Sequence, residues 1–144
     1  MIKFINADDV LNIRNIVLRE GRLQLQECRF PTDQLEGSFH LGYFDADQLV
    51  CVASFHPQNY NGYPGKAYQL RGMATLESHR SKSVGNQLVN FAIVYLKGLR
   101  TNYMWCNARK RAIRFYANIG MEIISEEFDV PYIGPHYAMY LKIQ

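Results

Sequence analysis

The segment between residues 67 and 97 constrains the fold of this chain more than any other. Residues 67–75 predict a strand. Residues 84–97 predict a long amphipathic helix, which Gly98 then ends. Its expected apolar side consists of Leu88, Val89, Ala92, Tyr95 and Leu96. A strand joined to a helix by a short polar turn is typical of a mixed α/β sheet whose helices cross over between strands.

The rest of the chain predicts more elements of both kinds. A helix capped by Asp8 or Asp9 should run to about Glu20, before Gly21, with Val10, Ile13, Ile16 and Val17 facing inward. Asp45-Ala46-Asp47-Gln48 reads as a hairpin turn, and residues 22–37 hold at most a second, short helix. Further strands are expected at residues 1–6, 38–44, 49–55, 103–106, 121–128 and 137–143, and a helix at 109–119 closed by Gly120.

Length and composition exclude several classes of protein. A chain of 144 residues suits one domain spanning 1–144, and it can bury a core without disulfides. The net charge of +3 is too small to indicate nucleic-acid binding, and no apolar run is long enough to span a bilayer. Cys28, Cys51, Cys106 and the four histidines lack metal-ligand spacing, so we expect no metal. The N-terminus shows no signal-peptide core, so we expect a cytoplasmic protein without a membrane partner.

The polar turn before the long helix is the most informative stretch for function. Free backbone N–H groups at a helix start bind anions, and Arg80 and Lys82 bring positive charge to the same place. A pyrophosphate would suit this turn, although an ordinary polar loop with serine caps explains the residues equally well. A P-loop is excluded because no Gly-Lys-Ser/Thr follows a glycine-rich run, and too few glycines are present for a dinucleotide site.

The turn resembles the coenzyme A site of the GNAT superfamily of N-acetyltransferases. The family motif is Gln/Arg-x-x-Gly-x-Gly/Ala, which follows a strand ending in a phrase like Gly-Met-Ala-Thr, here residues 72–75. Arg80 fills the first place and Gly85 the last. Ser83 stands where the first glycine belongs, and Ser81 replaces another common glycine.

A second stretch, at residues 105–121, resembles the family's later signature. In that signature a strand ends at Asn, and a helix then carries Ala-x-x-Phe-Tyr followed by Gly and an apolar residue. The matching residues are Asn107, Ala112, Phe115, Tyr116, Gly120 and Met121. Two signatures in the right order are far more specific than either alone.

The resemblance implies a fold and a coenzyme site. The fold would be a mixed, mostly antiparallel, twisted sheet with splayed central strands and about four flanking helices. Pantetheine would hydrogen-bond the strand at Met73, Ala74 and Thr75, and Asn107 would bond its amides. Tyr116 would line the site and act as proton donor to the leaving thiolate of acetyl-CoA. The pyrophosphate would sit on the amides of Arg80, Ser81, Lys82, Ser83, Val84, Gly85 and Asn86.

The acceptor would be a primary amine on a small molecule or a peptide. It must lose a proton before it attacks, and Glu77 and His136 are the candidate bases, each with a structural role as the alternative. Arg29, Arg71 and Tyr137 could line the acceptor pocket, where an Arg could hold a carboxylate. A basic cluster follows at Arg109, Lys110, Arg111 and Arg114, of which one or two could meet the coenzyme's 3′-phosphate.

Two other functions stay open from the sequence. The missing glycines leave room for a non-catalytic module of the same fold that binds coenzyme A as a sensor or partner domain. The basic cluster alone favours an RNA-binding α/β domain, although aromatic ribonucleoprotein motifs are absent. Many GNAT proteins are dimers, so a homodimer is expected. If position 83 requires a positive φ, serine costs about 1–2 kcal/mol there. If it requires close approach to phosphate, serine weakens coenzyme binding instead.

Overall fold

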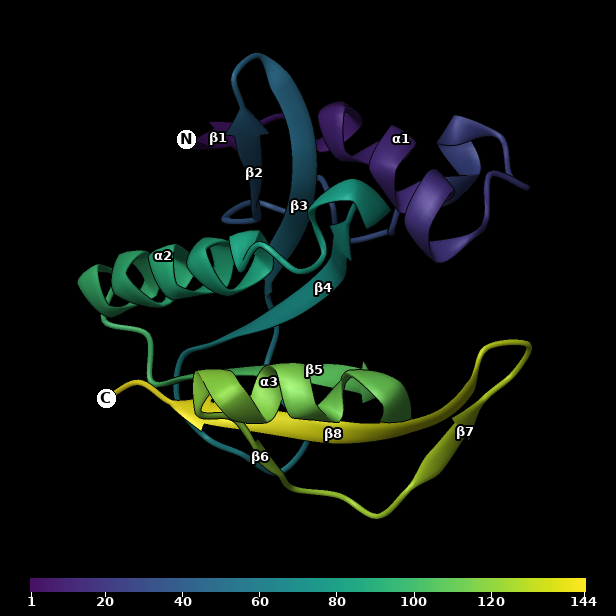
Figure 1. Cartoon of the computed structure of the whole chain (residues 1–144). Coiled ribbons are helices and arrows are strands. Elements are labelled where there is room, and N and C mark those ends of the chain that lie inside the picture. Colours follow the sequence, from purple (N-terminus) through teal and green to yellow (C-terminus); the bar gives the residue numbers. More distant parts are fainter.

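One sheet organises the molecule, in the strand order β1-β2-β3-β4-β5-β8-β6, with β7 also paired to β8. The computed structural model describes all of residues 1–144 (Figure 1). Neighbouring strands are antiparallel except β4 and β5, which confirms the expected mixed, mostly antiparallel sheet. The strands are β1 (Ile2–Ile5), β2 (Phe39–Asp45), β3 (Gln48–Pro57), β4 (Ala67–Thr75), β5 (Tyr103–Arg109), β6 (Glu122–Ile123), β7 (Phe128–Val130) and β8 (Gly134–Lys142).

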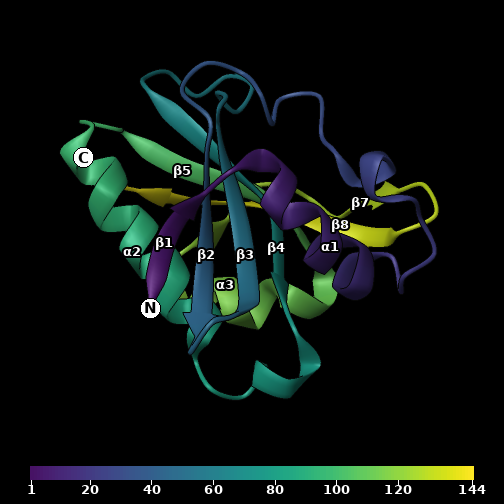
Figure 2. The ribbon, with the colours of Figure 1, turned by 90° about the horizontal axis from the view of Figure 1, so that it is seen from above.

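The helices cover both faces of this sheet. On one face, α2 (Val84–Gly98) and α3 (Ile113–Ile119) pack on the main core. The other face carries α1 (Leu11–Ile13) over a smaller core around Val52 and Ala74 (Figure 2). The structure thus has three α-helices where about four were expected. None of the helices is long and apolar enough to cross a membrane.

The predicted helix at residues 8–20 is in fact three short pieces. A 3-10 turn (Ala7–Val10) leads into α1, and a π-helical turn (Arg14–Leu18) follows. The widened turn shifts the buried face, so Ile16 is 49% exposed and the prediction that it faces inward was wrong. Arg14 is buried in its place. The Asp9 carboxylate accepts a hydrogen bond from the amide of Asn6, the N-cap residue.

Two other segments differ from expectation. Residues 22–37 contain only one 3-10 turn (Leu25–Cys28). The strand predicted at 121–128 is divided into β6 and β7, which pair with different parts of β8. In the long helix, Tyr95 is 37% exposed, whereas the other four predicted inward residues are fully buried. The remaining elements begin and end within a few residues of their predicted bounds.

A bulge in β4 and its divergence from β5 shape the site. Ser54 lies opposite Arg71 and Val52 opposite Ala74, so β4 has one extra residue here. Gly72, inside the bulge, has φ +65°. The bulge therefore sets Arg71 and Ala74 on the same sheet face. Beyond residue 69, β4 pairs with β5 no further, and the two strands splay apart as expected (Figure 1).

Candidate active site

A cavity of about 900 Å³ lies beside the diverging ends of β4 and β5. Its walls come from residues 69–75 of β4, the turn before α2, the end of β5 and one side of α3. Residues 17–19, Phe30, Val130, Ile133 and His136 complete it. Because β4 loses its strand partner here, its backbone groups on that edge are free to bond an extended ligand.

The start of α2 presents free amides to this cavity. Its first backbone hydrogen bond runs from the Gln87 amide to the Ser83 carbonyl over 3.0 Å. The amides of Val84, Gly85 and Asn86 precede that bond and have no intrahelical acceptor. Ser83 has φ +61°, so the family's glycine position does require a left-handed backbone, and its hydroxyl caps nothing. Such an arrangement of free amides can bind an anion, and it begins at a serine with a left-handed backbone angle.

Gly85 joins the two sequence signatures in space. A Cβ atom at Gly85 would lie 3.0 Å from the Met73 methyl carbon and 3.3 Å from the Phe115 ring. This packing brings β4, α2 and α3 together at one point. The glycine is thus needed for close approach and not for its backbone angle.

Tyr116 lines the same cavity. The residue is 7% exposed, and no protein group hydrogen-bonds its hydroxyl. Burial raises the pKa of Tyr116 well above its ordinary value, Cys106 raises it further, and Arg109 partly opposes the shift. The phenol therefore stays protonated near neutral pH and can donate a hydrogen bond or a proton.

His136 also lines the cavity and lies near the start of β8. Its Nδ1 lies 2.8 Å from the Gly134 carbonyl oxygen, so Nδ1–H donates and the neutral ring keeps Nε2 as an acceptor. The ring also stacks on Phe128 with centroids 5.9 Å apart. A histidine held in this tautomer can accept a proton at Nε2.

The structure brings most predicted coenzyme residues to one cavity. Those that line it are Met73, Ala74, Thr75, Arg80, Ser81, Ser83, Gly85, Asn86, Asn107 and Tyr116. Lys82 is exposed outside the lining, and the Val84 side chain belongs to the core, although its amide is free.

Three predicted acceptor-side residues lie elsewhere. Glu77 is exposed on a 3-10 turn (Glu77–His79) outside the cavity. Arg29 is exposed and pairs with Asp8 at 2.9 Å. The Tyr137 hydroxyl donates to Glu127 over 3.2 Å. All three residues thus lie outside the cavity lining. For Tyr137 the reason is that successive residues of a strand face opposite sides, so it points away from the side of His136.

Arg71 does reach the cavity, beside a residue that the sequence did not single out. Its guanidinium carbon lies 4.0 Å from the centroid of the Phe30 ring. The Arg14 guanidinium carbon lies 3.9 Å from the same centroid. Burial lowers the pKa of Arg71, and the nearby Arg14 charge lowers it further. Phe30 comes from the segment 22–37, whose irregular structure gave no pattern to interpret.

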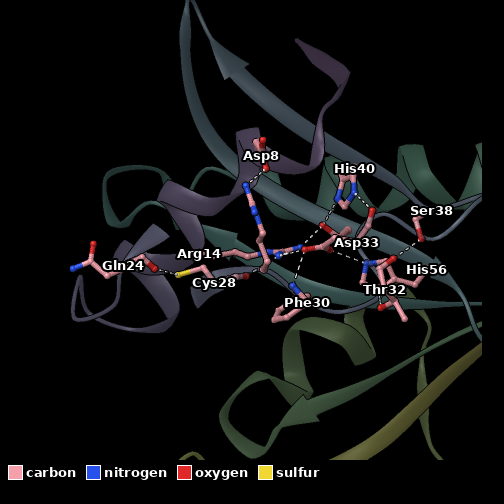
Figure 3. Close-up of polar contacts among 12 residues, drawn as sticks. Asp8, Arg14, Gln24, Cys28, Phe30, Thr32, Asp33, Ser38, His40 and His56 are labelled. Atoms are coloured by element: carbon pink, nitrogen blue, oxygen red, sulfur yellow. Dashed lines mark hydrogen bonds and ion pairs between the residues drawn. The ribbon is translucent and has the colours of Figure 1, made fainter. Parts of the chain in front are cut away.

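A buried ion pair holds Phe30 in place (Figure 3). Arg14 donates to both carboxylate oxygens of Asp33 at 2.7 and 2.9 Å. The Phe30 amide and His56 Nε2 also bond that carboxylate, at 2.8 and 3.0 Å. Burial would raise the pKa of Asp33, but the hydrogen bonds from Arg14, His56 and Phe30 hold it far below its ordinary value.

His40 extends this network on the same sheet face. Arg14 donates to the Ser54 hydroxyl at 2.7 Å, and that hydroxyl lies 2.6 Å from His40 Nδ1. His40 Nε2 lies 3.1 Å from the Asp33 carbonyl oxygen. Burial lowers the pKa of His40, so the ring is neutral. The network ties β2 and β3 to the loop that carries Phe30.

The cavity wall is cationic. Its lining includes five arginines, Arg19, Arg71, Arg80, Arg109 and Arg111, and no Asp or Glu. A second cavity, of about 750 Å³, shares Arg19, Arg109 and Arg111 with it. Of the predicted basic cluster, Lys110 pairs with Glu127 at 3.1 Å and Arg114 is exposed outside both cavities. No group of His, Cys, Asp and Glu gathers to hold a metal ion, and the three cysteines are free and buried.

Known proteins resemble this chain in sequence and in structure. The model of the acetyltransferase (GNAT) family matches residues 10–121. An uncharacterised N-acetyltransferase of Bacillus subtilis (strain 168), YitI, is 39% identical over 144 residues, covering 99% of this chain and 96% of the relative.

Solved structures share the fold at low sequence identity. An aminoglycoside 6′-N-acetyltransferase complexed with coenzyme A superposes with a TM-score of 0.72 at 15% identity, covering 100% of this chain and 97% of the other. FeeM, an N-acyl amino acid synthase from uncultured soil microbes, has a TM-score of 0.80 at 12% identity over 99% and 90% of the two chains. Escherichia coli ElaA has a TM-score of 0.76 at 19% identity over 97% and 99%.

Proposed function

We propose, since this chain belongs to the GNAT family of acetyltransferases, that it moves an acetyl group from acetyl-CoA to a primary amine by direct attack. The observation that carries the proposal is the cavity beside the splayed strands, which is lined both by the start of α2, with its free amides, and by Tyr116. The coenzyme A complex of the structural relative supports the same donor.

The chain's own groups suit each part of the donor. The amides opening α2 and the side chain of Arg80 would bind the diphosphate. The unpaired edge of β4 at residues 73–75 and the exposed Asn107 would bond the pantetheine amides. Arg111, in the turn before α3, would meet the 3′-phosphate.

The chemistry needs one proton removed and one supplied. His136 Nε2 would accept the proton of the bound ammonium, directly or through water. The free amine would then attack the thioester carbonyl carbon, forming the amide bond and breaking the C–S bond. Tyr116 would donate a hydrogen bond or a proton to the departing sulfur. The nitrogen loses its second proton as the amide forms, and this proton replaces the one that Tyr116 has given to the thiolate.

A thiol-release assay with acetyl-CoA across a panel of amines tests this proposal. Tyr116→Phe should lower kcat by about 100-fold while leaving the affinity for acetyl-CoA unchanged, because only the hydroxyl is lost. Tyr95→Phe, which removes a hydroxyl from a residue outside the cavity, is the matched control and should turn over normally.

The assay also separates the alternatives. Acetyl-CoA binding without thiol release on any amine would indicate the non-catalytic module in place of the transferase. Unchanged turnover in Tyr116→Phe would remove the tyrosine from the mechanism but leave the overall reaction standing.

A further inference from the structure

Arg71 is a partly buried cation that lines a cavity without any Asp or Glu residue. Arg14, Arg22 and Arg29 each pair with a carboxylate, whereas no ion pair involves Arg71. Its side chain also makes no hydrogen bond to the protein and rests on the Phe30 ring. A guanidinium removed from water without a partner is costly, so a wall that retains one favours an anionic ligand.

The nearest carboxylate cannot serve Arg71. Asp33 has two oxygens with about four lone-pair sites between them. Arg14 occupies one site on each oxygen, the Phe30 amide takes a second on Oδ2, and His56 takes a second on Oδ1. No lone-pair site of this carboxylate is therefore left for Arg71. The Asp33 charge favours the Arg71 cation, but burial and the Arg14 charge outweigh it and lower the pKa of Arg71.

The position of Arg71 separates it from the phosphate-binding end. The β4 bulge puts Arg71 on the sheet face of Arg14 and Phe30, whereas Met73 contacts the opposite face, beside Gly85 of α2. The phosphates of a coenzyme at α2 would account for Arg80 and Arg111, but not for Arg71. An acceptor that carries only the positive charge of its amine would enter a cavity lined by five arginines and no Asp or Glu, and the repulsion between like charges would disfavour its binding.

We propose that the acceptor is an amino acid or a similar small amine that also carries a carboxylate, and that Arg71 binds this carboxylate. The planar guanidinium, with Phe30 against it, suits a two-point hydrogen bond to a carboxylate. The inference rests on the proposed transferase function and adds the substrate class. By holding the carboxylate, Arg71 orients the acceptor, and the amine nitrogen of the acceptor then forms the amide bond.

The direct test compares pairs of acceptors that differ only in the carboxylate. Phenylalanine with phenethylamine, lysine with cadaverine and 4-aminobutyrate with propylamine span several amine–carboxylate distances. We expect kcat/KM for acetyl transfer to favour at least one acid over its partner by about 10–100-fold, the value of a charged hydrogen bond. Equal or better turnover of the decarboxylated partner in every pair would overturn the inference and leave acetyl transfer intact.

Variants of Arg71 assign the effect to this residue. Arg71→Gln should lower kcat/KM for the acid about 10–100-fold, mainly through KM, and leave the decarboxylated amine unaffected. Arg71→Lys should retain part of the preference, because it keeps the charge but loses the fork. Arg100→Gln, at an exposed position outside both cavities, removes the same charge and should change neither value.

A binding measurement covers the case in which no acceptor is turned over. Calorimetry with coenzyme A and the N-acetylated forms of the same pairs should show the acid binding about 10–100-fold more tightly, with the preference lost in Arg71→Gln. Coenzyme binding and the thermal midpoint show that the variant is folded. Equal binding of both members, or binding of neither, would contradict the inference, whereas absence of thiol release with every amine contradicts the transferase proposal.

Discussion

The two walls of the cavity are built in different ways. The wall that we propose for the coenzyme consists of short continuous segments, the turn before α2 and the β5–α3 connection, whose shape depends on local backbone conformation. The wall that we propose for the acceptor combines Arg19, Phe30, Arg71 and Ile133, which are far apart in sequence, and the buried Arg14–Asp33 pair supports it from behind. One wall thus depends on backbone geometry and the other on a tertiary ion pair. A substitution in one wall should therefore disrupt that wall and leave the other intact.

The largest effect is expected from breaking the ion pair. Asp33→Asn leaves the buried Arg14 charge uncompensated, which should lower the free energy of unfolding by about 3–5 kcal/mol. Chemical denaturation measures this change. Asp8→Asn, which breaks the exposed pair with Arg29, is the control and should cost less than about 1 kcal/mol. A similar cost for both variants would mean that the buried network does not support the acceptor wall.

Acid should loosen the same wall in two stages. His40 has a lowered folded pKa, so protons favour the unfolded state and stability should fall as the pH drops below about 6.5. Asp33 also has a lowered folded pKa, so its stabilisation is present above about pH 4 and is lost as the pH falls further. Thermal midpoints between pH 3 and 8 measure both. A midpoint unchanged from pH 7 to pH 5 would contradict the assignment for His40.

A crowding substitution sharpens the comparison on the coenzyme side. Gly85→Ala places a methyl group 3.0 Å from Met73 and 3.3 Å from Phe115, which should cost about 1–3 kcal/mol and weaken acetyl-CoA binding. Gly98→Ala, in the same helix with open space around it, should be neutral or stabilising by up to about 1 kcal/mol. Calorimetry of acetyl-CoA binding should show a loss only in the first variant, and equal affinities would argue against this contact.

The smallest expected effect concerns the strained serine. Ser83→Gly relieves a left-handed backbone angle and should stabilise the protein by about 1 kcal/mol, with acetyl-CoA binding equal or tighter. Ser81 lies in the same turn without a positive φ, so Ser81→Gly should not stabilise. A looser acetyl-CoA complex in Ser83→Gly would mean that the serine hydroxyl matters more for binding than the backbone strain.

The sequence by itself determined the sheet, the long helix α2 and the segments that form the proposed coenzyme wall. These depend on hydrophobic periodicity, on helix starts and on two signatures whose residues are near one another in the chain, so local patterns were enough. Tyr116 and Gly85 were predicted in this way and lie in the cavity lining, and the structure gives Ser83 the positive φ that the sequence left as one of two possibilities.

Only the tertiary structure decided the acceptor wall. Residues 22–37 have almost no regular structure, so no periodicity could place Phe30, and the π-helical turn that buries Arg14 runs against the helical pattern. Among Arg29, Arg71 and Tyr137, the sequence could not choose, because the choice depends on the β4 bulge and on which carboxylates are already paired. Which charged side chains form ion pairs depends on distances between residues that are far apart in the sequence, and no local sequence pattern predicts those distances.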